Sequence, residues 1–515
     1  MTLHASSIEW AIDFVADHSD GDLFPKVPEM EAIRARRGEF VSLLEGKQLS
    51  SFKPGPSRRF IVPKDEISYR QATQLDPQDS LILSALIHQF GAGIERRRKS
   101  SRHVHSYRFS PTVEGGLYGA DSAWNDFWCQ AHESSKAHPI ILYCDIADFY
   151  NQVYHHDVEN QLIESGFPNQ AVKWLISLLE STTAGVSRGV PVGPHGIHLI
   201  AEASLIPIDD SISHNGLNCI RYADDIVVFC DTMKEAKLAL ATIAGVLDKQ
   251  QRLMLQKHKT RFYEAPKFQA LCRTMIEDRP ISPDEAGLLK LIKKYSGGNR
   301  YKTILYSQIS KKDWESISEN TIRGIIEDYI SAEPIDFIRL RWFYRRLTQI
   351  GHPGAVHVSL HCLDQLAPCF ANICLYLASV QSIEPKQWED IGTRLIKLLD
   401  SEEVKSNEYF SLSILSLFSK NKKINHFASL AGSFQSSPSF VRREIFLAAM
   451  TNSAYPWIRE HKESFINMDP WQKMAFIYCC SGLPRDEKKY FINRWEFDRP
   501  FEKVLAKWSR AEGSS

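Results

Sequence analysis

Two adjacent carboxylates give the strongest chemical signal in this sequence. Asp224 and Asp225 lie between two short apolar runs, at residues 219–222 and 226–229. Carboxylates side by side at a turn repel each other and lose hydration, and a divalent cation that binds both offsets these costs. Asp145, at the end of another apolar run, can supply a third carboxylate. Three carboxylates can hold two Mg²⁺ or Mn²⁺ ions about 4 Å apart, where one ion activates an attacking hydroxyl and the other stabilises the leaving group.

β-Strands must position these carboxylates, because each lies beside a short apolar run. Residues 140–144 form a continuous apolar run that predicts a buried strand ending at Asp145. Residues 219–222 and 226–229 predict two strands around a tight acidic turn. Between residues 58 and 267 such runs alternate with helical patterns, which predicts an α/β or α+β unit.

The second half of the chain has a helical pattern throughout. Ser282-Pro283-Asp284-Glu285 is a capping sequence with proline at the first helical position, and Gly297-Gly298 ends the same helix. Further helices are predicted near residues 388–399 and 441–450. The predicted domains are an N-terminal extension (1–57), an α+β unit (58–272) and an all-α domain that looks like an irregular solenoid or bundle (273–515).

Composition limits the possible partners. The chain has 515 residues, with 62 basic and 62 acidic ones, so a nucleic acid would have to meet a local basic patch. The apolar and aromatic content excludes disordered and fibrous classes. No window of 18 uncharged apolar residues predicts a membrane span, and the N-terminus lacks the basic start of a signal peptide. We therefore predict a cytoplasmic protein without a membrane partner.

Four blocks of the sequence, in this order, resemble the motif blocks of reverse transcriptases. They are Asp-Ile-Ala-Asp-Phe-Tyr (145–150), Arg-Gly-Val-Pro-Val-Gly-Pro (188–194), Tyr-Ala-Asp-Asp (222–225) and Leu-Met-Leu-Gln-Lys-His-Lys-Thr (253–260). Four blocks in order are far more specific than any single one. The resemblance implies a polymerase palm and fingers. In it Asp145, Asp224 and Asp225, with Ile146, bind two Mg²⁺ or Mn²⁺ ions and catalyse nucleotidyl transfer from dNTPs.

The same resemblance implies which residues bind the nucleotide. Lys64 and Arg70 resemble the basic pair that grips the triphosphate, and two further nucleotide-binding candidates, Ile146 and Gly193, belong to the first and second blocks. Tyr150 resembles the aromatic residue that excludes a 2′-hydroxyl, which implies selection of deoxynucleotides. The residue types also fit a solvated strand for Lys64 and Arg70, and a core position for Tyr150.

Two basic segments are candidates for contact with nucleic acid. The first is the run at residues 95–108, and the candidates there and in the fourth block are Arg96, Arg97, Arg98, Arg102 and Lys259. The second surrounds the aromatic residues 342–344 and contains Arg339, Arg341, Arg345 and Arg346. Both segments also fit surfaces that are solvated, with their aromatic side chains packed inside.

One position departs from templated reverse transcriptases, because Val192 stands where those enzymes usually carry glutamine. Together with His195-Gly196-Ile197-His198 and the long helical half, this resembles the abortive-infection (Abi) branch of phage defence, closest to members carried by P2-type prophages. That resemblance implies a HEAT-like helical domain, DNA synthesis without a template, and priming by a protein hydroxyl in the bacterial cytoplasm. It also implies a single-stranded DNA product attached covalently to the protein, and a homo-oligomer such as a trimer.

Two alternatives remain open. One is an RNA-templated, retron-like reverse transcriptase, and the other is a helical-repeat binding module with a nucleotide-sensing palm. No sequence feature identifies a priming residue. The segment before Tyr69 contains no tyrosine, so a primer there would be serine or threonine, and Tyr301 and Tyr306 are candidates in the helical half.

Overall fold

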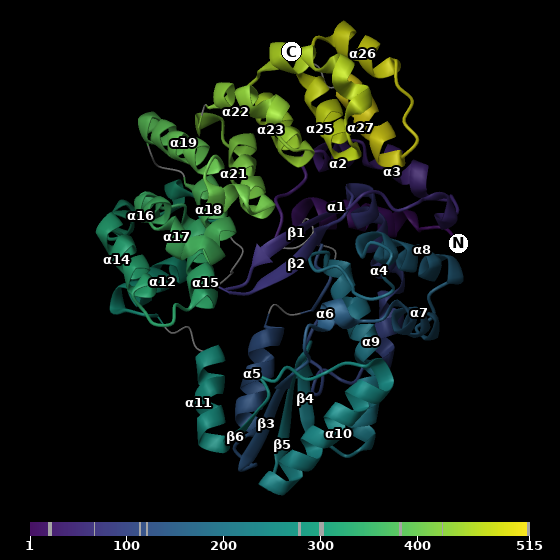
Figure 1. The fold of residues 1–515 in the computed structure, drawn as a ribbon, viewed down its shortest axis with the longest axis vertical. Coiled ribbons are helices and arrows are strands. Elements are labelled where there is room, and N and C mark those ends of the chain that lie inside the picture. Colours follow the sequence, from purple (N-terminus) through teal and green to yellow (C-terminus); the bar gives the residue numbers. More distant parts are fainter. Residues whose placement is uncertain are drawn as a thin grey trace. The chain divides into compact units, whose positions relative to one another are not determined.

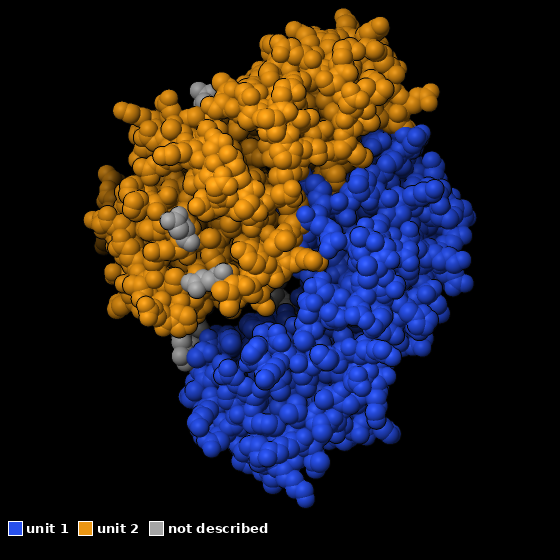
Figure 2. All heavy atoms as spheres, in the orientation of Figure 1, with its two compact units in different colours: residues 1–59, 72–278, 498–504 blue, residues 60–71, 279–497, 505–515 orange. Residues whose placement is uncertain are grey.

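The chain forms two compact units in a computed structural model. The model describes residues 1–18, 23–65, 67–112, 115–119, 122–276, 280–297, 303–380, 384–424 and 426–511. Unit 1 comprises residues 1–59, 72–278 and 498–504, and unit 2 comprises residues 60–71, 279–497 and 505–515 (Figure 2). The units are defined by contacts between residues, so each unit contains several separate segments of the chain.

A four-stranded antiparallel sheet forms the centre of unit 1 (Figure 1). Its strands, in the spatial order β4-β5-β3-β6, are β4 (Cys219–Tyr222), β5 (Asp225–Cys230), β3 (Ile140–Asp145) and β6 (Arg261–Glu264). The strands predicted around Asp145 and the Asp224-Asp225 pair are confirmed. Apolar side chains fill both faces of β3 and β5, so both faces of the sheet need to be covered.

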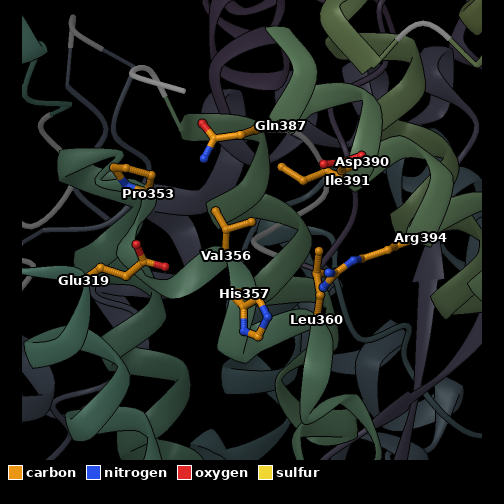
Figure 3. A pocket seen from close by; sticks show the side chains of 9 residues that line it. All are labelled: Glu319, Pro353, Val356, His357, Leu360, Gln387, Asp390, Ile391 and Arg394. Carbon is orange, nitrogen blue, oxygen red and sulfur yellow. The ribbon is translucent and has the colours of Figure 1, made fainter. Parts of the chain in front are cut away.

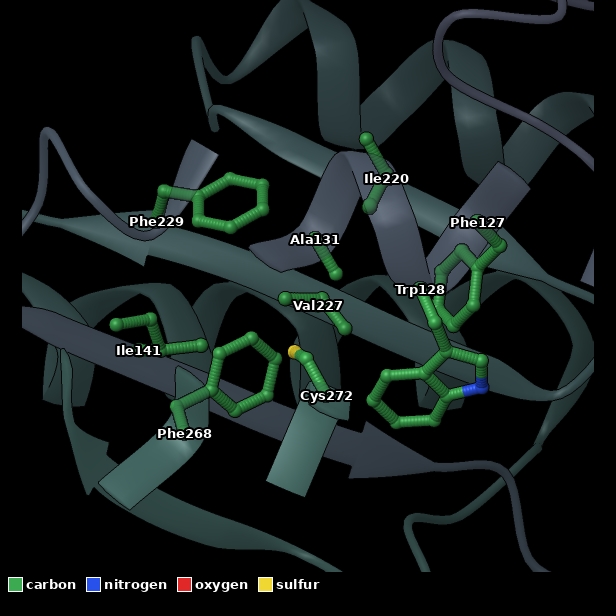
Figure 4. Close-up of a cluster of buried hydrophobic side chains, with 9 residues drawn as sticks. All are labelled: Phe127, Trp128, Ala131, Ile141, Ile220, Val227, Phe229, Phe268 and Cys272. Atoms are coloured by element: carbon green, nitrogen blue, oxygen red, sulfur yellow. The ribbon is translucent and has the colours of Figure 1, made fainter. Parts of the chain in front are cut away.

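Helices cover both faces of this sheet. Helices α5 (Ala123–Ser134) and α11 (Ala265–Ile276) bury one face, where Phe127, Trp128 and Phe268 pack on Ile141 and Val227 (Figure 4). Helix α10 (Met233–Gln251) packs against β3 and β5, on the face away from α5 and α11 (Figure 1). The sheet is therefore a rigid base for the carboxylates at its edge.

A long, largely buried helix, α4 (Pro77–Arg97), contacts α1 (Ala5–His18), α8 (Asn169–Thr182) and α9 (His195–His214). The remaining helices of unit 1 are α2 (Met30–Ala35), α3 (Arg37–Leu44), α6 (Phe149–Gln152) and α7 (His155–Glu164).

The structure divides the N-terminal half differently from the predicted boundaries. Helix α1 packs along α4, and the indole N–H of Trp174 donates to the carbonyl of Phe52 at 2.9 Å, so residues 1–57 belong to the core of unit 1. At the other end of the chain, Arg499 pairs with both carboxylate oxygens of Asp76, at 2.5 and 2.7 Å.

Unit 2 consists of the tip of a β-hairpin and a series of helices. The hairpin strands are β1 (Arg58–Pro63) and β2 (Tyr69–Gln74), and residues 60–71 cluster with the helices. The helices are α12 (Pro283–Ser296), α13 (Lys311–Glu315), α14 (Glu319–Ile330), α15 (Phe337–Ile350), α16 (Val356–His361), α17 (Leu363–Leu366), α18 (Phe370–Ser379), α19 (Pro385–Leu399), α20 (Glu402–Lys405), α21 (Glu408–Lys420), α22 (Phe427–Ser433), α23 (Ser439–Thr451), α24 (Tyr455–Glu460), α25 (Pro470–Cys479) and α26 (Arg485–Asn493). Helix α27 (Pro500–Ala511) is divided between the two units.

Successive helices pack on one another in unit 2. Helix α15 contacts α18, α18 contacts α21, α21 contacts α23, and α23 contacts α25 (Figure 1). The predicted cap of α12 is confirmed, because the Ser282 hydroxyl accepts the Glu285 N–H and Gly297 ends the helix at φ +64°. Residues 280–511, as far as they are described, contain no β-strand.

A pocket of about 290 Å³ opens in this unit between α16 and α19 (Figure 3). Its charged or titratable lining residues are Glu319, His357, Asp390 and Arg394. No helix among the described residues has the length and apolar character needed to cross a membrane.

Candidate functional site

The three predicted carboxylates meet at one edge of the sheet. Asp145 ends β3 and Asp225 begins β5, and these two residues are paired directly across the antiparallel ladder. Asp224 lies in the turn before Asp225, and its carbonyl accepts the N–H of Ile146 at 2.9 Å. Asp145 is buried, with 3% of its surface exposed, whereas Asp224 and Asp225 are half-buried. Strand pairing therefore brings together the carboxylates that the sequence separates.

The turn before the acidic pair has a strained backbone that two hydrogen bonds hold. Ala223 has φ +50°, in the left-handed region that residues other than glycine rarely adopt, at a cost of about 1–3 kcal/mol. Its N–H donates to the Ser106 hydroxyl at 2.9 Å, and its carbonyl accepts from the Arg221 guanidinium at 2.8 Å. Both polar groups of this residue are thus fixed from inside the protein.

A buried charge network supports these two contacts. Glu202, on α9, accepts hydrogen bonds from Ser106 at 2.6 Å, Arg98 at 2.8 Å and Arg221 at 2.9 Å. Arg221 also pairs with Asp209 at 2.7 Å. Burial would raise the pKa of Glu202, but Arg221 and Arg98 hold that pKa below its ordinary value. Two arginines and two carboxylates therefore balance in charge beneath the turn.

The structure corrects the prediction for Arg98. Its guanidinium is buried and donates to Glu202, to Glu95 and to the carbonyls of Ser106 and Tyr107. A guanidinium with these four contacts inside the protein cannot reach a phosphate backbone, because its departure would leave the buried Glu202 carboxylate without this partner. The role of Arg98 is to support the acidic turn.

The rest of the basic run divides between surface and internal contacts. Arg96 and Arg102 are exposed, so nucleic-acid contact stays a prediction for them. Arg97 is half-buried and joins α4 to α7 through the Gln161 side chain at 2.9 Å, the Ser165 hydroxyl at 3.0 Å and an ion pair with Glu164. The run is therefore not one continuous surface.

Two side chains hold the carboxylates themselves. The Tyr143 hydroxyl donates to Asp225 Oδ1 at 2.5 Å, and the Lys259 ammonium pairs with Asp145 Oδ2. Lys259 was predicted to contact nucleic acid, and in the structure its partner is this carboxylate. Burial raises the pKa of Asp225 to about 7, with the charges of Asp224 and Asp145 adding to the shift. The three carboxylates are thus close enough to act on one another.

Two aromatic side chains hold the Tyr150 side chain in place. Its hydroxyl bonds to Nδ1 of His198 at 2.6 Å, and the Tyr107 ring stacks on the His198 ring with centroids 4.2 Å apart. Burial lowers the pKa of His198 to about 3, so its ring is neutral and shares one hydrogen bond with the Tyr150 hydroxyl through Nδ1. The charges of Glu202 and Asp224 act on Tyr150, which places it beside the acidic turn. Its role as a sugar gate stays a prediction.

The other nucleotide-binding candidates fall in two places. Gly193 is buried and has φ +134°, a backbone angle that favours glycine and turns the chain into α9. Lys64 and Arg70 lie on the hairpin segment 60–71, which belongs to unit 2. Their contact with a triphosphate stays a prediction.

Several supporting residues were missed by the sequence analysis. The sequence could have indicated Tyr143, because this residue lies two positions before Asp145 and therefore on the same face of β3. Ser106 had none, because 117 positions separate it from Ala223. His198 was noticed as part of an unusual block but was assigned no role.

The comparisons with known proteins identify the class of domain. The reverse transcriptase (RNA-dependent DNA polymerase) family matches residues 62–275. The chain therefore contains a reverse transcriptase domain and is a nucleotidyltransferase of the RNA-directed DNA polymerase type. Among solved structures, apo telomerase from Candida tropicalis is similar at 10% identity, covering 70% of this chain and 69% of that chain, with a TM-score of 0.33. No curated protein matches the chain.

Divalent ions are the cofactors that reverse transcriptase domains generally use. The oxygen donors of Asp145, Asp224 and Asp225 suit Mg²⁺. Burial, and after it the charges of Asp224 and Asp145, raise the pKa of Asp225, and a cation would offset both costs. In the described part of the chain, no three His, Cys, Asp or Glu side chains already have the arrangement of a metal site. An ion at Asp145 would have to replace the Lys259 ammonium.

Proposed function

We propose that this chain is a DNA polymerase that joins dNTPs at Asp145, Asp224 and Asp225. The observation that carries this proposal is the direct pairing of Asp145 and Asp225 across β3 and β5, within the reverse transcriptase domain. Carboxylates fixed on adjacent strands can hold two divalent ions without rearrangement of the backbone.

The protein's own residues divide the work in this proposal. When bound, Mg²⁺ or Mn²⁺ would activate the attacking hydroxyl and stabilise the leaving pyrophosphate. Asp145, Asp224 and Asp225 hold the ions, and Tyr143 orients the Asp225 carboxylate. Tyr150 excludes the 2′-hydroxyl of ribonucleotides by steric contact, and His198 with Tyr107 keeps Tyr150 in place.

The finer proposal is template-free, protein-primed synthesis in abortive infection of phage-infected bacteria. It is supported by the resemblance of the sequence blocks, by Val192 in place of glutamine, and by the long helical half. A side-chain hydroxyl held near the ions could act as the first nucleophile, which would leave the DNA attached to the protein. Of the two tyrosine candidates, Tyr301 lies outside the described residues, and the side chain of Tyr306 is likewise not described.

Incubation of the purified full chain with labelled dNTPs and Mg²⁺ tests the proposal and its alternatives. Polymer formed without nucleic acid supports template-free synthesis. Polymer formed only with added RNA supports an RNA-templated enzyme. No polymer under either condition contradicts the polymerase proposal and favours a binding module.

Denaturing electrophoresis of the same reactions tests protein priming. The proposal predicts a labelled band at protein size that lengthens with time and becomes free DNA only after protease treatment. Label that runs as free DNA after boiling in detergent, without protease, contradicts protein priming while leaving the polymerase proposal intact.

A further inference from the structure

The pocket of unit 2 combines apolar and charged side chains (Figure 3). Its apolar lining residues are Pro353, Val356, Leu360 and Ile391. Glu319, the first residue of α14, supplies one carboxylate, and α19 supplies Asp390 and Arg394. The volume of about 290 Å³ lies at the lower end of the range for small-molecule sites, roughly 300–1,000 Å³. The pocket therefore suits a small molecule.

Close packing at two glycines fixes the walls of this pocket. A methyl group on Gly354 would lie 3.1 Å from Cα of Glu319, so the start of α14 lies directly against this residue. A methyl group on Gly392, in α19, would lie 2.6 Å from Cγ2 of Ile424. Only glycine allows such close approach without displacement of the neighbouring atoms. The helices that line the pocket are thus held in place by the core of the unit.

Two opposite charges on α19 are not used inside the protein. Asp390 and Arg394 are four residues apart and therefore share one face of the helix, with Cβ atoms about 5–6 Å apart. Across the described ranges of the chain, neither side chain has a partner in a hydrogen bond or an ion pair. Both line the pocket instead. A carboxylate and a guanidinium side by side can receive a ligand that carries a cation and an anion close together.

The charges of a basic amino acid match those of the pocket. The α-ammonium and the α-carboxylate, which are attached to one carbon atom, correspond to Asp390 and Arg394. Figure 3 shows Glu319 on one side of Val356 and Arg394 on the other, so a side chain that crosses Val356 would bring a cation to Glu319. Two carboxylates and one guanidinium are complementary to the two cations and one anion of arginine or lysine.

We propose that this pocket binds a free amino acid with a cationic side chain, arginine or lysine. The proposal does not depend on the polymerase activity, because all the lining residues belong to unit 2. Other small ligands match the charges less well. The phosphates of a nucleotide would meet the repulsion of Glu319 and Asp390, and a polyamine would leave Arg394 without an anion.

Calorimetric titration of the full chain with L-arginine and L-lysine, without nucleotide, tests the proposal. We expect saturable binding, and a Kd that rises about tenfold in Arg394→Ala and in Asp390→Asn, each of which removes one charge-assisted contact. Lys397→Ala and Glu389→Gln change charges of the same helix that do not line the pocket, and both should bind as the wild type does. Circular dichroism confirms that each variant is folded.

Analogues of lysine test each part of the ligand. L-Norleucine lacks the side-chain cation, so its Kd should be about tenfold higher than that of L-lysine, and Glu319→Gln should remove this difference. Nα-Acetyl-L-lysine lacks the α-ammonium and should also bind about tenfold more weakly.

Four results would overturn the proposal. The first is a wild type that binds neither L-arginine nor L-lysine, and the second is unchanged affinity in Arg394→Ala. The third is putrescine bound as tightly as L-lysine, which would make the pocket a polyamine site. The fourth is Nα-acetyl-L-lysine bound as tightly as L-lysine, which would make it a site for the C-terminal residue of another chain.

Discussion

The charges beneath the acidic turn and the charges of the turn itself are organised in opposite ways. Under the turn, Arg98 and Arg221 are buried against Glu202 and Asp209, and every charge has an opposite partner. In the turn and on the paired strand, Asp145, Asp224 and Asp225 lie close together, and burial, with the charges of Asp224 and Asp145, raises the pKa of Asp225. Charges that balance stabilise the backbone that they contact, whereas carboxylates that repel one another favour a bound cation.

The difference separates residues that hold the site from residues that meet the substrate. Removing a member of the balanced network leaves its partners buried and unpaired, so it should lower stability. Removing one of the three carboxylates relieves repulsion, so it should lower activity without lowering stability.

The largest expected effect follows from removing the centre of the balanced network. Glu202→Ala leaves Arg98 and Arg221 without their shared partner, and we expect the free energy of unfolding to fall by about 3–5 kcal/mol. Urea denaturation measures the change, with the exposed Glu164→Ala as a control near zero. A loss below about 1 kcal/mol for Glu202→Ala would mean that the network does not hold the turn.

The next effect concerns the choice of sugar. Tyr150→Val should reduce the preference for dNTPs over rNTPs by roughly a hundredfold, because a steric clash worth about 2.7 kcal/mol is removed. His198→Phe removes the hydrogen-bond partner of Tyr150 but keeps a ring for Tyr107, so a smaller loss, about threefold to tenfold, is expected. Competition between labelled dNTP and rNTP measures both, and unchanged preference in Tyr150→Val makes Tyr150 a core residue.

The variant Ser106→Ala tests whether the hydrogen bond under the turn affects kcat without affecting KM. Ser106→Ala leaves the Ala223 N–H without its acceptor, so kcat should fall about 10- to 100-fold, from about 1.4–3 kcal/mol of lost positioning. The KM for dNTPs should stay within about twofold, because Ser106 is buried under the turn. A change in KM with kcat unchanged would contradict this role.

The last expected effect is a dependence of stability on pH. The pKa of Asp225 is about 7 in the folded protein and near 4 in the unfolded chain. Between these values the folded state binds one more proton, so its stability falls as pH rises, and the loss is complete above about pH 7.

Asp225→Asn cannot ionise, and it still accepts the Tyr143 hydrogen bond. In EDTA the variant should therefore be more stable than the wild type at pH 8, by up to about 4 kcal/mol for a shift of roughly three pKa units, and the difference should shrink toward pH 4. Thermal unfolding at the two pH values measures it. A wild type that is equally stable relative to the variant at both pH values would contradict the shift.

Local pattern was enough to predict the strands and the carboxylates. An apolar run ending in Asp145, and a hairpin around Asp224-Asp225, require no knowledge of distant residues, and the structure has both. The helix that begins after Ser282 was likewise predicted from its cap.

Contacts between distant residues were beyond the sequence. A basic run looks the same whether solvated or buried, and the partner that buries Arg98 lies 104 positions away at Glu202. The hairpin clusters with the helices through contacts such as Arg341 with Lys64, separated by 277 positions. No local periodicity carries such information.

The most direct test of the central claim is incorporation of labelled dNTPs by the full chain with Mg²⁺, compared between carboxylate variants. Asp224→Asn and Asp225→Asn each remove one charge from the three carboxylates, and each should lower incorporation by roughly a thousandfold or more, about 4 kcal/mol in the barrier. Asp231→Asn, one residue past the far end of β5 beside His138, should match the wild type. Wild-type incorporation by a folded double variant with Asp224→Asn and Asp225→Asn would contradict the account.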